Sequence, residues 1–315
     1  MKYNKILIVG INESKLDKEY WETIGSLTKK LVTLPKDSPE INTEITDADC
    51  LLVNFGVSVD RKTIDKALNL KYIGVLATAY GKVDTTYAKS KNIAVCNIAG
   101  YSTESVAEFV LSVILEHIRQ LEEGKQRGRN KNYSEAGISA TEIKNKIFGI
   151  VGLGSIGSRV AEIALGFGAD VRYWSRNRKE KIENMGVKYT DVSSLVSNAD
   201  FLSLHLAQTN DTEGFLNIEK INKIKKGAIV INTAPMELVD IDALSERLAK
   251  GDITFILDHS DEMAEDDLKK ISKYANCIIY PPIGYITKEA RMAKQEIFVG
   301  NIENFLKGSA TNKVN

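Results

Sequence analysis

The sequence lacks an excess of either charge, a long apolar run and repetitive segments, and each absence excludes a class of protein. Its 42 Lys and Arg residues balance its 42 Asp and Glu residues, so nothing indicates a nucleic-acid footprint or a membrane-surface patch. No apolar run approaches the length of a membrane span, and the run from Ile6 to Val9 is too short for the apolar core of a signal peptide. The 315 residues suffice for two domains of ordinary globular composition.

Cysteine is also scarce. The three cysteines, Cys50, Cys96 and Cys277, lie far apart and fit no metal-ligand spacing, so we predict no metal site. Each stands in an apolar, strand-like stretch, which favours a buried and unreactive thiol. Free thiols are typical of the reducing cytoplasm, and we expect the protein to be cytoplasmic.

One stretch, from Lys146 to Arg178, has the pattern of a dinucleotide-binding turn. The apolar run Ile147 to Val151 is followed by glycines spaced G-x-G-x-x-G, then by apolar residues at helical spacing and a second apolar strand. This succession of strand, glycine turn, helix and strand is the context that the motif requires. We expect Gly152 to make the turn, Gly154 to let the backbone approach a pyrophosphate at the helix N-terminus, and Gly157 to let helix and strand pack closely.

The end of the second strand indicates which cofactor is bound. An NAD site places Asp or Glu there to hold the ribose hydroxyls, but this strand is followed by Ser175, Arg176 and Arg178. Guanidinium groups bind a phosphate through charge-assisted hydrogen bonds. We therefore favour NADP over NAD. A solvent-exposed basic loop is the alternative interpretation.

Short apolar runs alternate with helical segments along the whole chain. We predict strands, beyond the two described above, at Lys5 to Gly10, Cys50 to Val53, Tyr72 to Leu76, Ile93 to Cys96, Ala199 to Leu204, Ala228 to Ile231, Thr254 to Leu257 and Cys277 to Tyr280. Such alternation predicts an α/β fold with two Rossmann-like, doubly wound parallel-sheet domains. We expect a flavodoxin-like substrate-binding domain from residues 1–101 with 292–315, and a dinucleotide-binding domain from residues 102–291, with the site in the cleft between them.

Two long helices and one polar segment complete the pattern. The first helix begins at the cap Ser102-Thr103-Glu104 and extends to Leu121. The polar segment Glu122 to Ile143 lacks clear periodicity, and it is either an arm over a neighbouring subunit or a mobile loop. Thr287 to Gly308 has the apolar spacing of one long helix, which we expect to return to the first domain.

Several motifs together resemble a known family. They are IAVCNIAGYSTESVAE (Ile93 to Glu108), IFGIVGLGSIG (Ile147 to Gly157), ADFLSLHL (Ala199 to Leu206), KKGAIVINTA (Lys225 to Ala234) and LVDIDAL (Leu238 to Leu244). Over nearly its whole length the chain resembles the D-isomer-specific 2-hydroxyacid dehydrogenases, and the first motif resembles their hydroxypyruvate and glyoxylate reductase branch. The resemblance implies a nicotinamide cofactor, usually a homodimer formed through the cofactor domain, and NADPH where Ser-Arg follows the second strand.

The resemblance also implies which residues contact the ligands. The cofactor contacts are Gly154, Ser155 and Ile156 at the pyrophosphate; Ser175, Arg176 and Arg178 at the 2′-phosphate; His205, Leu206 and Thr212 by the ribose and linker; Thr233 and Ala234 by the nicotinamide ribose; and Asp258 at the carboxamide. The substrate contacts are Asn54, Ala79, Tyr80, Pro235 and Pro282.

The positions of the family's three catalytic residues hold other residues here. Pro235 stands at the position of the Arg that binds the substrate carboxylate. Met263 stands at the position of the Glu that tunes the catalytic His, and Glu262 lies one residue earlier. Pro282 stands at the position of that His, which exchanges a proton with the substrate oxygen. A proline side chain neither donates nor accepts a hydrogen bond. Loss of a general acid commonly lowers a rate by about 10²–10⁴, so the three changes argue against 2-oxo acid reduction by the family mechanism.

Other side chains are candidate proton donors. Tyr80 and Lys82 lie on the predicted substrate loop, and His259 directly follows a predicted strand. Tyr285 and Glu237, beside the vacated positions, are weaker candidates. Tyr80, Lys82 and His259 each have a structural interpretation as well. Tyr80 is then an aromatic lid, Lys82 a solvated lysine and His259 a histidine bonded within the fold.

The leading hypothesis is an NADP-dependent oxidoreductase that transfers a hydride to a non-standard substrate, namely a carbonyl compound, an imine or an enone. The first alternative is a catalytically silent NADP-binding protein that serves as a sensor or partner subunit. The second is a glyoxylate or hydroxypyruvate reductase with repositioned catalytic groups. In each case we expect a small-molecule ligand and a homodimer, and no nucleic-acid or membrane partner.

Overall fold

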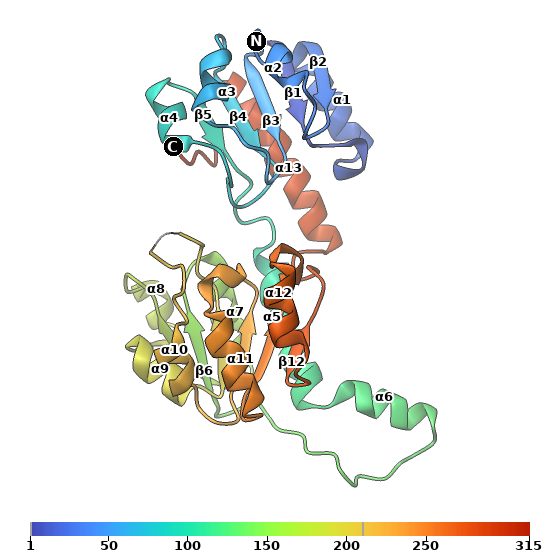
Figure 1. Ribbon diagram of the computed structural model, residues 1–315, viewed down its shortest axis with the longest axis vertical. Helices are drawn as coiled ribbons and strands as arrows, with labels where there is room; N and C mark the ends of the chain where they lie inside the picture. The colour runs from blue at the N-terminus through green and yellow to red at the C-terminus, as the bar shows by residue number, and fades with distance from the viewer. Residues whose placement is uncertain (1, 210) are drawn as a thin grey trace. The chain divides into compact units, whose positions relative to one another are not determined.

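The computed structural model describes residues 2–209 and 211–315, and the chain divides into two compact units (Figure 1). Unit 1 comprises the residues up to Ser102 together with Thr287–Asn315, and unit 2 comprises Thr103–Ile286. Over the described residues, unit 1 contains a parallel sheet of five strands and unit 2 a parallel sheet of seven. The predicted α/β class with two doubly wound parallel sheets is confirmed.

The sheet of unit 1 has the strand order β2-β1-β3-β4-β5. Its strands are β1 (Tyr3–Val9), β2 (Thr28–Leu34), β3 (Cys50–Val53), β4 (Tyr72–Val75) and β5 (Ala94–Cys96), and its helices are α1 (Lys18–Ser26), α2 (Ile41–Glu44), α3 (Arg61–Lys66), α4 (Thr85–Ser90) and α13 (Lys288–Leu306). One core cluster contains Ile64 and Ala88 of α3 and α4, and the other contains Ile24 of α1 and Phe298 of α13. Helices therefore cover both faces of the sheet.

The sheet of unit 2 has the strand order β12-β11-β10-β9-β6-β7-β8. Its strands are β6 (Ile147–Val151), β7 (Asp170–Trp174), β8 (Lys188–Tyr189), β9 (Phe201–Leu204), β10 (Ile229–Asn232), β11 (Thr254–Leu257) and β12 (Cys277–Ile279), and its helices are α5 (Thr103–Ile118), α6 (Leu121–Arg129), α7 (Ser155–Gly166), α8 (Glu180–Glu183), α9 (Val192–Asn198), α10 (Ile218–Lys223), α11 (Ile241–Ala249) and α12 (Glu265–Ser272). The strand order reverses at β6, which lies between β9 and β7. Ligands of open α/β sheets bind at the carboxyl ends of the strands beside such a reversal.

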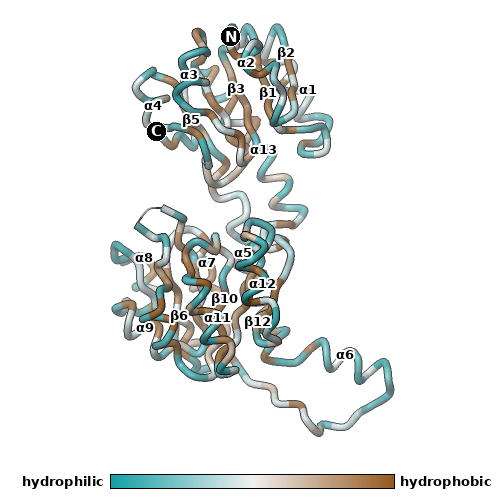
Figure 2. The backbone as a smooth tube through the Cα atoms, in the orientation of Figure 1, coloured by the Kyte–Doolittle hydropathy of each residue, from teal (hydrophilic) through white to brown (hydrophobic). Residues whose placement is uncertain are grey.

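Apolar runs become the buried strands, as their composition dictates. Every residue of β3, β9 and β10 is buried, and in the backbone tube of Figure 2 strands such as β6 are coloured brown, as hydrophobic residues are. The three cysteines are free and buried, and burial raises the pKa of each thiol. No helix of residues 2–209 and 211–315 is long and apolar enough to cross a bilayer.

The segment after α5 begins with a helix that the sequence analysis did not predict. The helix α6 buries no residue, so it lacks the apolar periodicity by which helices are found. Pairs one turn apart stabilise it instead: Glu122 contacts Lys125 and Glu123 contacts Arg127, each at 2.6 Å. Arg127 also donates hydrogen bonds to carbonyl oxygens at Ser134 and Ala136, which fix the loop that follows.

Candidate functional site

The glycine turn after β6 has the geometry that its spacing predicts. Gly152 has φ +93°, and a Cβ there would lie 2.8 Å from the carbonyl oxygen of His205. A Cβ on Gly157 would lie 2.1 Å from the carbonyl oxygen of Gly152, so α7 approaches the turn more closely than any side chain permits. Beside Gly154, in contrast, a Cβ would meet nothing within 4 Å. The start of α7 therefore offers open space and no side-chain cap to an incoming anion.

The loop after β9 lies beside this turn and is held by its own hydrogen bonds. His205 donates its backbone N–H to Val151, and its Nε2 lies 2.7 Å from the Ser203 hydroxyl. Desolvation lowers the pKa of His205 to about 3, so the imidazole is neutral at physiological pH. The Thr212 hydroxyl donates to the Ala207 carbonyl at 2.7 Å and accepts from the Thr209 amide. The hydrogen bonds fix the loop, and burial keeps His205 uncharged within it.

The loop after β7 carries the three residues predicted to recognise a 2′-phosphate, and they differ in availability. The buried Ser175 donates its hydroxyl to the Asn177 carbonyl at 2.6 Å. Arg178 donates to both carboxylate oxygens of Glu183, at 3.1 and 2.5 Å. Arg176 is exposed and pairs with the exposed Asp211 at 3.5 Å. Of the three, Arg176 is the one whose guanidinium is most open to a ligand.

Asp258, directly after β11, is a buried carboxylate with one oxygen left unbonded. The residue is 2% exposed, its Oδ2 accepts the Gly284 amide at 3.0 Å, and its buried Oδ1 has no hydrogen-bond partner among the residues that the structure describes. Burial raises the pKa of this carboxyl. A Cβ on Gly284 would lie 2.6 Å from Oδ2, so this loop requires glycine. Sequence reasoning did not assign Gly284 a role, although it ends the P-P-I-G stretch.

His259 follows Asp258 and is partly exposed. Its Nε2 lies 3.9 Å from Oδ1 of Asp258, and no residue in the described ranges forms a hydrogen bond with its buried Nδ1. The side chain is therefore not satisfied by bonds within the fold, which was the structural interpretation of this residue.

The two prolines stand at the ends of the neighbouring strands β10 and β12. After β10, the buried Asn232 side chain accepts the Ala234 amide at 3.1 Å and shapes the turn in which Thr233 and Pro235 are half-buried. The following Met236 is buried in the core. After β12, Pro282 is half-buried as well. Because β10, β11 and β12 are parallel neighbours, both prolines lie at the same edge as Asp258 and supply neither charge nor proton there.

Carboxylates gather at this edge instead. Glu237, Asp261 and Glu262 are exposed on the short helices that follow Pro235 and His259. Partial desolvation raises the pKa of Glu262, and the negative charges of Asp261 and Glu237 raise it further. Within the described part of the chain, none of these three carboxylates pairs with a Lys or Arg. Sequence reasoning did not group these three carboxylates, because Glu237 comes close to Asp261 and Glu262 only through the pairing of β10 with β11.

In unit 1, the loops after β3 and β4 hold the predicted residues Asn54, Ala79, Tyr80 and Lys82. The two loops touch: Gly81 has φ +55°, and a Cβ there would lie 3.3 Å from the ring of Phe55. Tyr80 is 44% exposed, and no hydrogen bond among the described residues joins it to Lys82. The expected Tyr–Lys donor pair is thus not joined directly in this structure.

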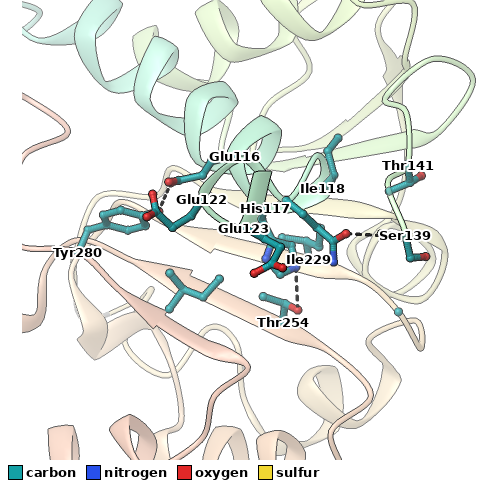
Figure 3. Close-up of a pocket in the computed structure, with 13 residues that line it drawn as sticks. Glu116, His117, Ile118, Glu122, Glu123, Ser139, Thr141, Ile229, Thr254 and Tyr280 are labelled. Carbon is teal, nitrogen blue, oxygen red and sulfur yellow. Dashed lines mark hydrogen bonds between the residues drawn. The ribbon is translucent and has the colours of Figure 1, made fainter. Parts of the chain in front are cut away.

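A cavity of about 520 Å³ lies elsewhere in unit 2 (Figure 3). Its lining includes Glu116, His117, Thr254 and Tyr280, close to the amino-terminal ends of β10 and β11. Tyr280 donates a hydrogen bond to Glu116, and His117 lies 3.4 Å from the Thr254 hydroxyl. None of the predicted ligand-binding residues lines it, so this cavity is separate from the glycine turn. No cluster of three or more His, Cys, Asp or Glu over residues 2–209 and 211–315 could hold a metal ion.

Residues 111–284, the greater part of unit 2, match the family model described as D-isomer specific 2-hydroxyacid dehydrogenase, NAD binding domain. The chain belongs to this family. A hydroxypyruvate reductase of Blautia hydrogenotrophica is 33% identical over 315 residues, which cover 97% of each chain. A glyoxylate reductase of Thermofilum pendens is 30% identical over 87% of this chain and 83% of its own. This 2-hydroxyacid dehydrogenase family member is therefore an NAD(P)H-dependent oxidoreductase.

Solved structures of similar proteins agree with the family. The D-lactate dehydrogenase from Aquifex aeolicus, complexed with NAD and lactic acid, has a TM-score of 0.83 at 30% identity, covering 96% of both chains. An acyclic imino acid reductase (Bsp5), in complex with NADPH and D-Arg, has a TM-score of 0.86 at 26% identity, covering 99% of this chain and 100% of that one. One of these relatives binds NAD and the other NADPH. In this family member, the open side of Gly154 and the uncapped start of α7 fit a dinucleotide.

Proposed function

We propose that the protein is an NADPH-dependent imine reductase, which transfers a hydride to the carbon of a protonated C=N bond and releases an amine. The observation that carries this proposal is the composition of the carboxyl edge of unit 2. Pro235 and Pro282 occupy the positions at which the family has its Arg and His, and unpaired carboxylates stand beside them. We interpret these replacements as the loss of the family's catalytic triad, with Met263 at the third position.

The two substrate classes differ in their need for a proton. Reduction of a carbonyl group leaves an alkoxide, which a general acid must protonate as it forms. A protonated imine already carries its proton, so hydride addition at carbon gives a neutral amine directly. A bound nicotinamide supplies the hydride in either case. An edge that holds two prolines in place of Arg and His is therefore compatible with imine reduction and poorly suited to carbonyl reduction.

The charge at this edge supports the same substrate. A 2-oxo acid brings a carboxylate, which Asp258, Asp261, Glu262 and Glu237 repel once the family's Arg is gone. A protonated imine brings a positive charge, which these carboxylates attract. Burial raises the pKa values of Asp258 and Glu262 although the nearby His259 acts to lower them, so a bound cation would stabilise both ionised carboxylates further.

The cofactor contacts follow from the glycine turn. We propose that the first turn of α7, at Ser155 and Ile156, binds the pyrophosphate; that His205, Leu206 and Thr212 line the ribose; and that Thr233 and Ala234 line the nicotinamide ribose. The unbonded Oδ1 of Asp258 would accept the carboxamide N–H. Ser175 and Arg176 favour NADPH, and the similar imino acid reductase is described with NADPH and D-Arg.

Two further expectations belong to the same proposal. We propose a cytoplasmic homodimer formed through unit 2, in which the exposed helix α6 and the loop after it contact the second copy. Support comes from the exposure of this segment, whose helix buries no residue against its own unit. Light scattering of the purified protein, with and without residues 121–142, measures the oligomeric state directly.

An assay of NADPH oxidation separates imine from carbonyl reduction. The protein is mixed with NADPH and an aldehyde or ketone that carries no carboxylate, alone and with an excess of methylamine, which condenses with the carbonyl group to an imine. Imine reduction predicts turnover only when the amine is present, and mass spectrometry of the N-methylamino product, with deuterium from labelled NADPH on carbon, identifies the bond formed. Tight NADPH binding without turnover on a broad panel of imines would instead support the silent NADP-binding protein.

A second candidate is a hydroxypyruvate or glyoxylate reductase, and the relative of 33% identity with that name favours it. In this case a proton must come from Tyr80, Lys82 or His259, with Asn54 and Ala79 as further substrate contacts. Rapid reduction of hydroxypyruvate without amine would establish it. The donor would then be the residue whose removal, as Tyr80→Phe, Lys82→Met or His259→Gln, lowers kcat by about 10²-fold or more.

A further inference from the structure

The exposed ion pair between Arg176 and Asp211 joins two loops that flank the glycine turn. Arg176 follows β7, and Asp211 belongs to the loop that follows β9. In the sheet, β6 lies between these two strands and ends at the glycine turn. The pair at 3.5 Å therefore extends across the carboxyl end of β6, where the adenosine half of a dinucleotide lies in folds of this type.

The other arginine of the loop has a different task. Arg178 donates two hydrogen bonds to Glu183, and its guanidinium lies 5.4 Å from the centre of the Tyr189 ring. Glu183 also accepts a hydrogen bond from Tyr173 at 2.6 Å, and these donors lower its pKa to about 2. Arg178 is thus bound to a carboxylate that stays ionised at every physiological pH. Of the two arginines in this loop, Arg176 is the one whose pairing, with the exposed Asp211, a ligand can most readily replace, and the exposed Lys179 adds a further positive charge to the loop.

We propose that Asp211 is a specificity-determining residue, which competes with the 2′-phosphate of NADPH for Arg176. In the empty protein Asp211 neutralises Arg176, and on binding the phosphate takes its place. This inference rests on the proposed preference for NADPH. Since both side chains of the pair are more than two-thirds exposed, at 72% and 79%, the exchange involves little desolvation. Asp211 would lower the affinity for NADPH and leave the affinity for NADH, which has no 2′-phosphate, unchanged.

Dissociation constants for NADPH and NADH, from the quenching of protein fluorescence, test the exchange. Asp211→Asn should tighten NADPH about two- to fivefold, the range expected for an exposed ion pair, and change NADH less than about twofold. Glu213→Gln is the matched control, because it removes the same charge from the same loop at an exposed residue without touching Arg176. Arg176→Ala should weaken NADPH at least about tenfold and abolish the effect of Asp211→Asn in the double variant.

The outcomes separate this inference from the proposals on which it rests. An unchanged NADPH constant in Asp211→Asn, or an equal gain in Glu213→Gln, overturns the competition. A wild-type protein that binds NADH as tightly as NADPH overturns the cofactor preference itself. Imine reduction is decided by turnover and is not affected by either binding result. Because salt screens an exposed ion pair, the gain in NADPH affinity in Asp211→Asn should also shrink when NaCl is raised from about 50 mM to about 500 mM.

Discussion

Substitution of single glycines in the turn should separate its structural task from its binding task. In Gly157→Ala, the new Cβ would lie 2.1 Å from the carbonyl oxygen of Gly152, whereas real Cβ contacts are essentially never under 3.0 Å. Helix α7 must therefore move by about 0.9 Å, away from backbone that cannot yield as a flexible side chain would. Overpacking of this kind typically destabilises a protein by about 1–3 kcal/mol.

Gly154→Ala provides the contrast, because its Cβ meets nothing within 4 Å and its φ of −79° suits any residue. We expect Gly154→Ala to keep the wild-type midpoint of urea unfolding while weakening NADPH binding at least about tenfold, since the methyl group fills the approach to the backbone. Gly157→Ala should lower both the midpoint and the affinity.

Gly166→Ala is the control for the change of glycine to alanine within α7, since it also meets open space. It should leave NADPH binding unchanged and stabilise the protein by a few tenths to about 1 kcal/mol. The interpretation of the turn would be refuted by a Gly157→Ala protein with the wild-type unfolding midpoint, or by a Gly154→Ala protein that binds NADPH normally.

Two pH-dependent predictions follow from the carboxylates of unit 2. The pKa of Glu183 is lowered from 4.5 to about 2. Its stabilising contacts are therefore present above about pH 4.5 and are lost as the pH falls towards 2. Glu183→Gln should lower the urea midpoint at pH 7, and the difference from the wild type should shrink as the pH falls from about 4.5 to 2. Burial raises the pKa of Asp258, so ionisation there destabilises the fold as the pH rises. Asp258→Asn keeps the hydrogen bond to Gly284 and should therefore be more stable than the wild type by about 1–3 kcal/mol at pH 8. It should lose this advantage in acid and bind the cofactor less well. A variant that is less stable than the wild type at pH 8 would contradict the destabilising role of the ionised carboxylate.

The sequence predicted the buried strands well, because a run such as Cys50–Val53 or Thr254–Leu257 can be stable only inside a parallel sheet. It failed where burial gives no signal. The edge strand β2 (Thr28–Leu34) carries two lysines and only one fully buried residue, so it was not predicted as a strand. The two-residue strand β8 was missed for the same reason, since both its residues are exposed.

The candidate site shows the same limit. The roles of Gly152 and Gly157 could be inferred, because G-x-G-x-x-G spacing implies one backbone geometry. The state of a charged side chain could not, because its partner is set by tertiary contacts. The sequence predicts that Arg178 binds a phosphate, but in the structure it forms an ion pair with Glu183.

The order of the chain has a consequence for synthesis on the ribosome. The core of unit 1 includes Phe298, Val299 and Ile302 of α13, and Phe305 packs its ring 5.0 Å from that of Tyr72. These residues are translated after all of unit 2, about 15–60 s after β1 at common elongation rates. The nascent first unit therefore waits with one apolar face covered only in part, by α1, while the second unit completes. Chaperone demand should accordingly centre on the N-terminal segment, and a chain that stops before α13 should aggregate.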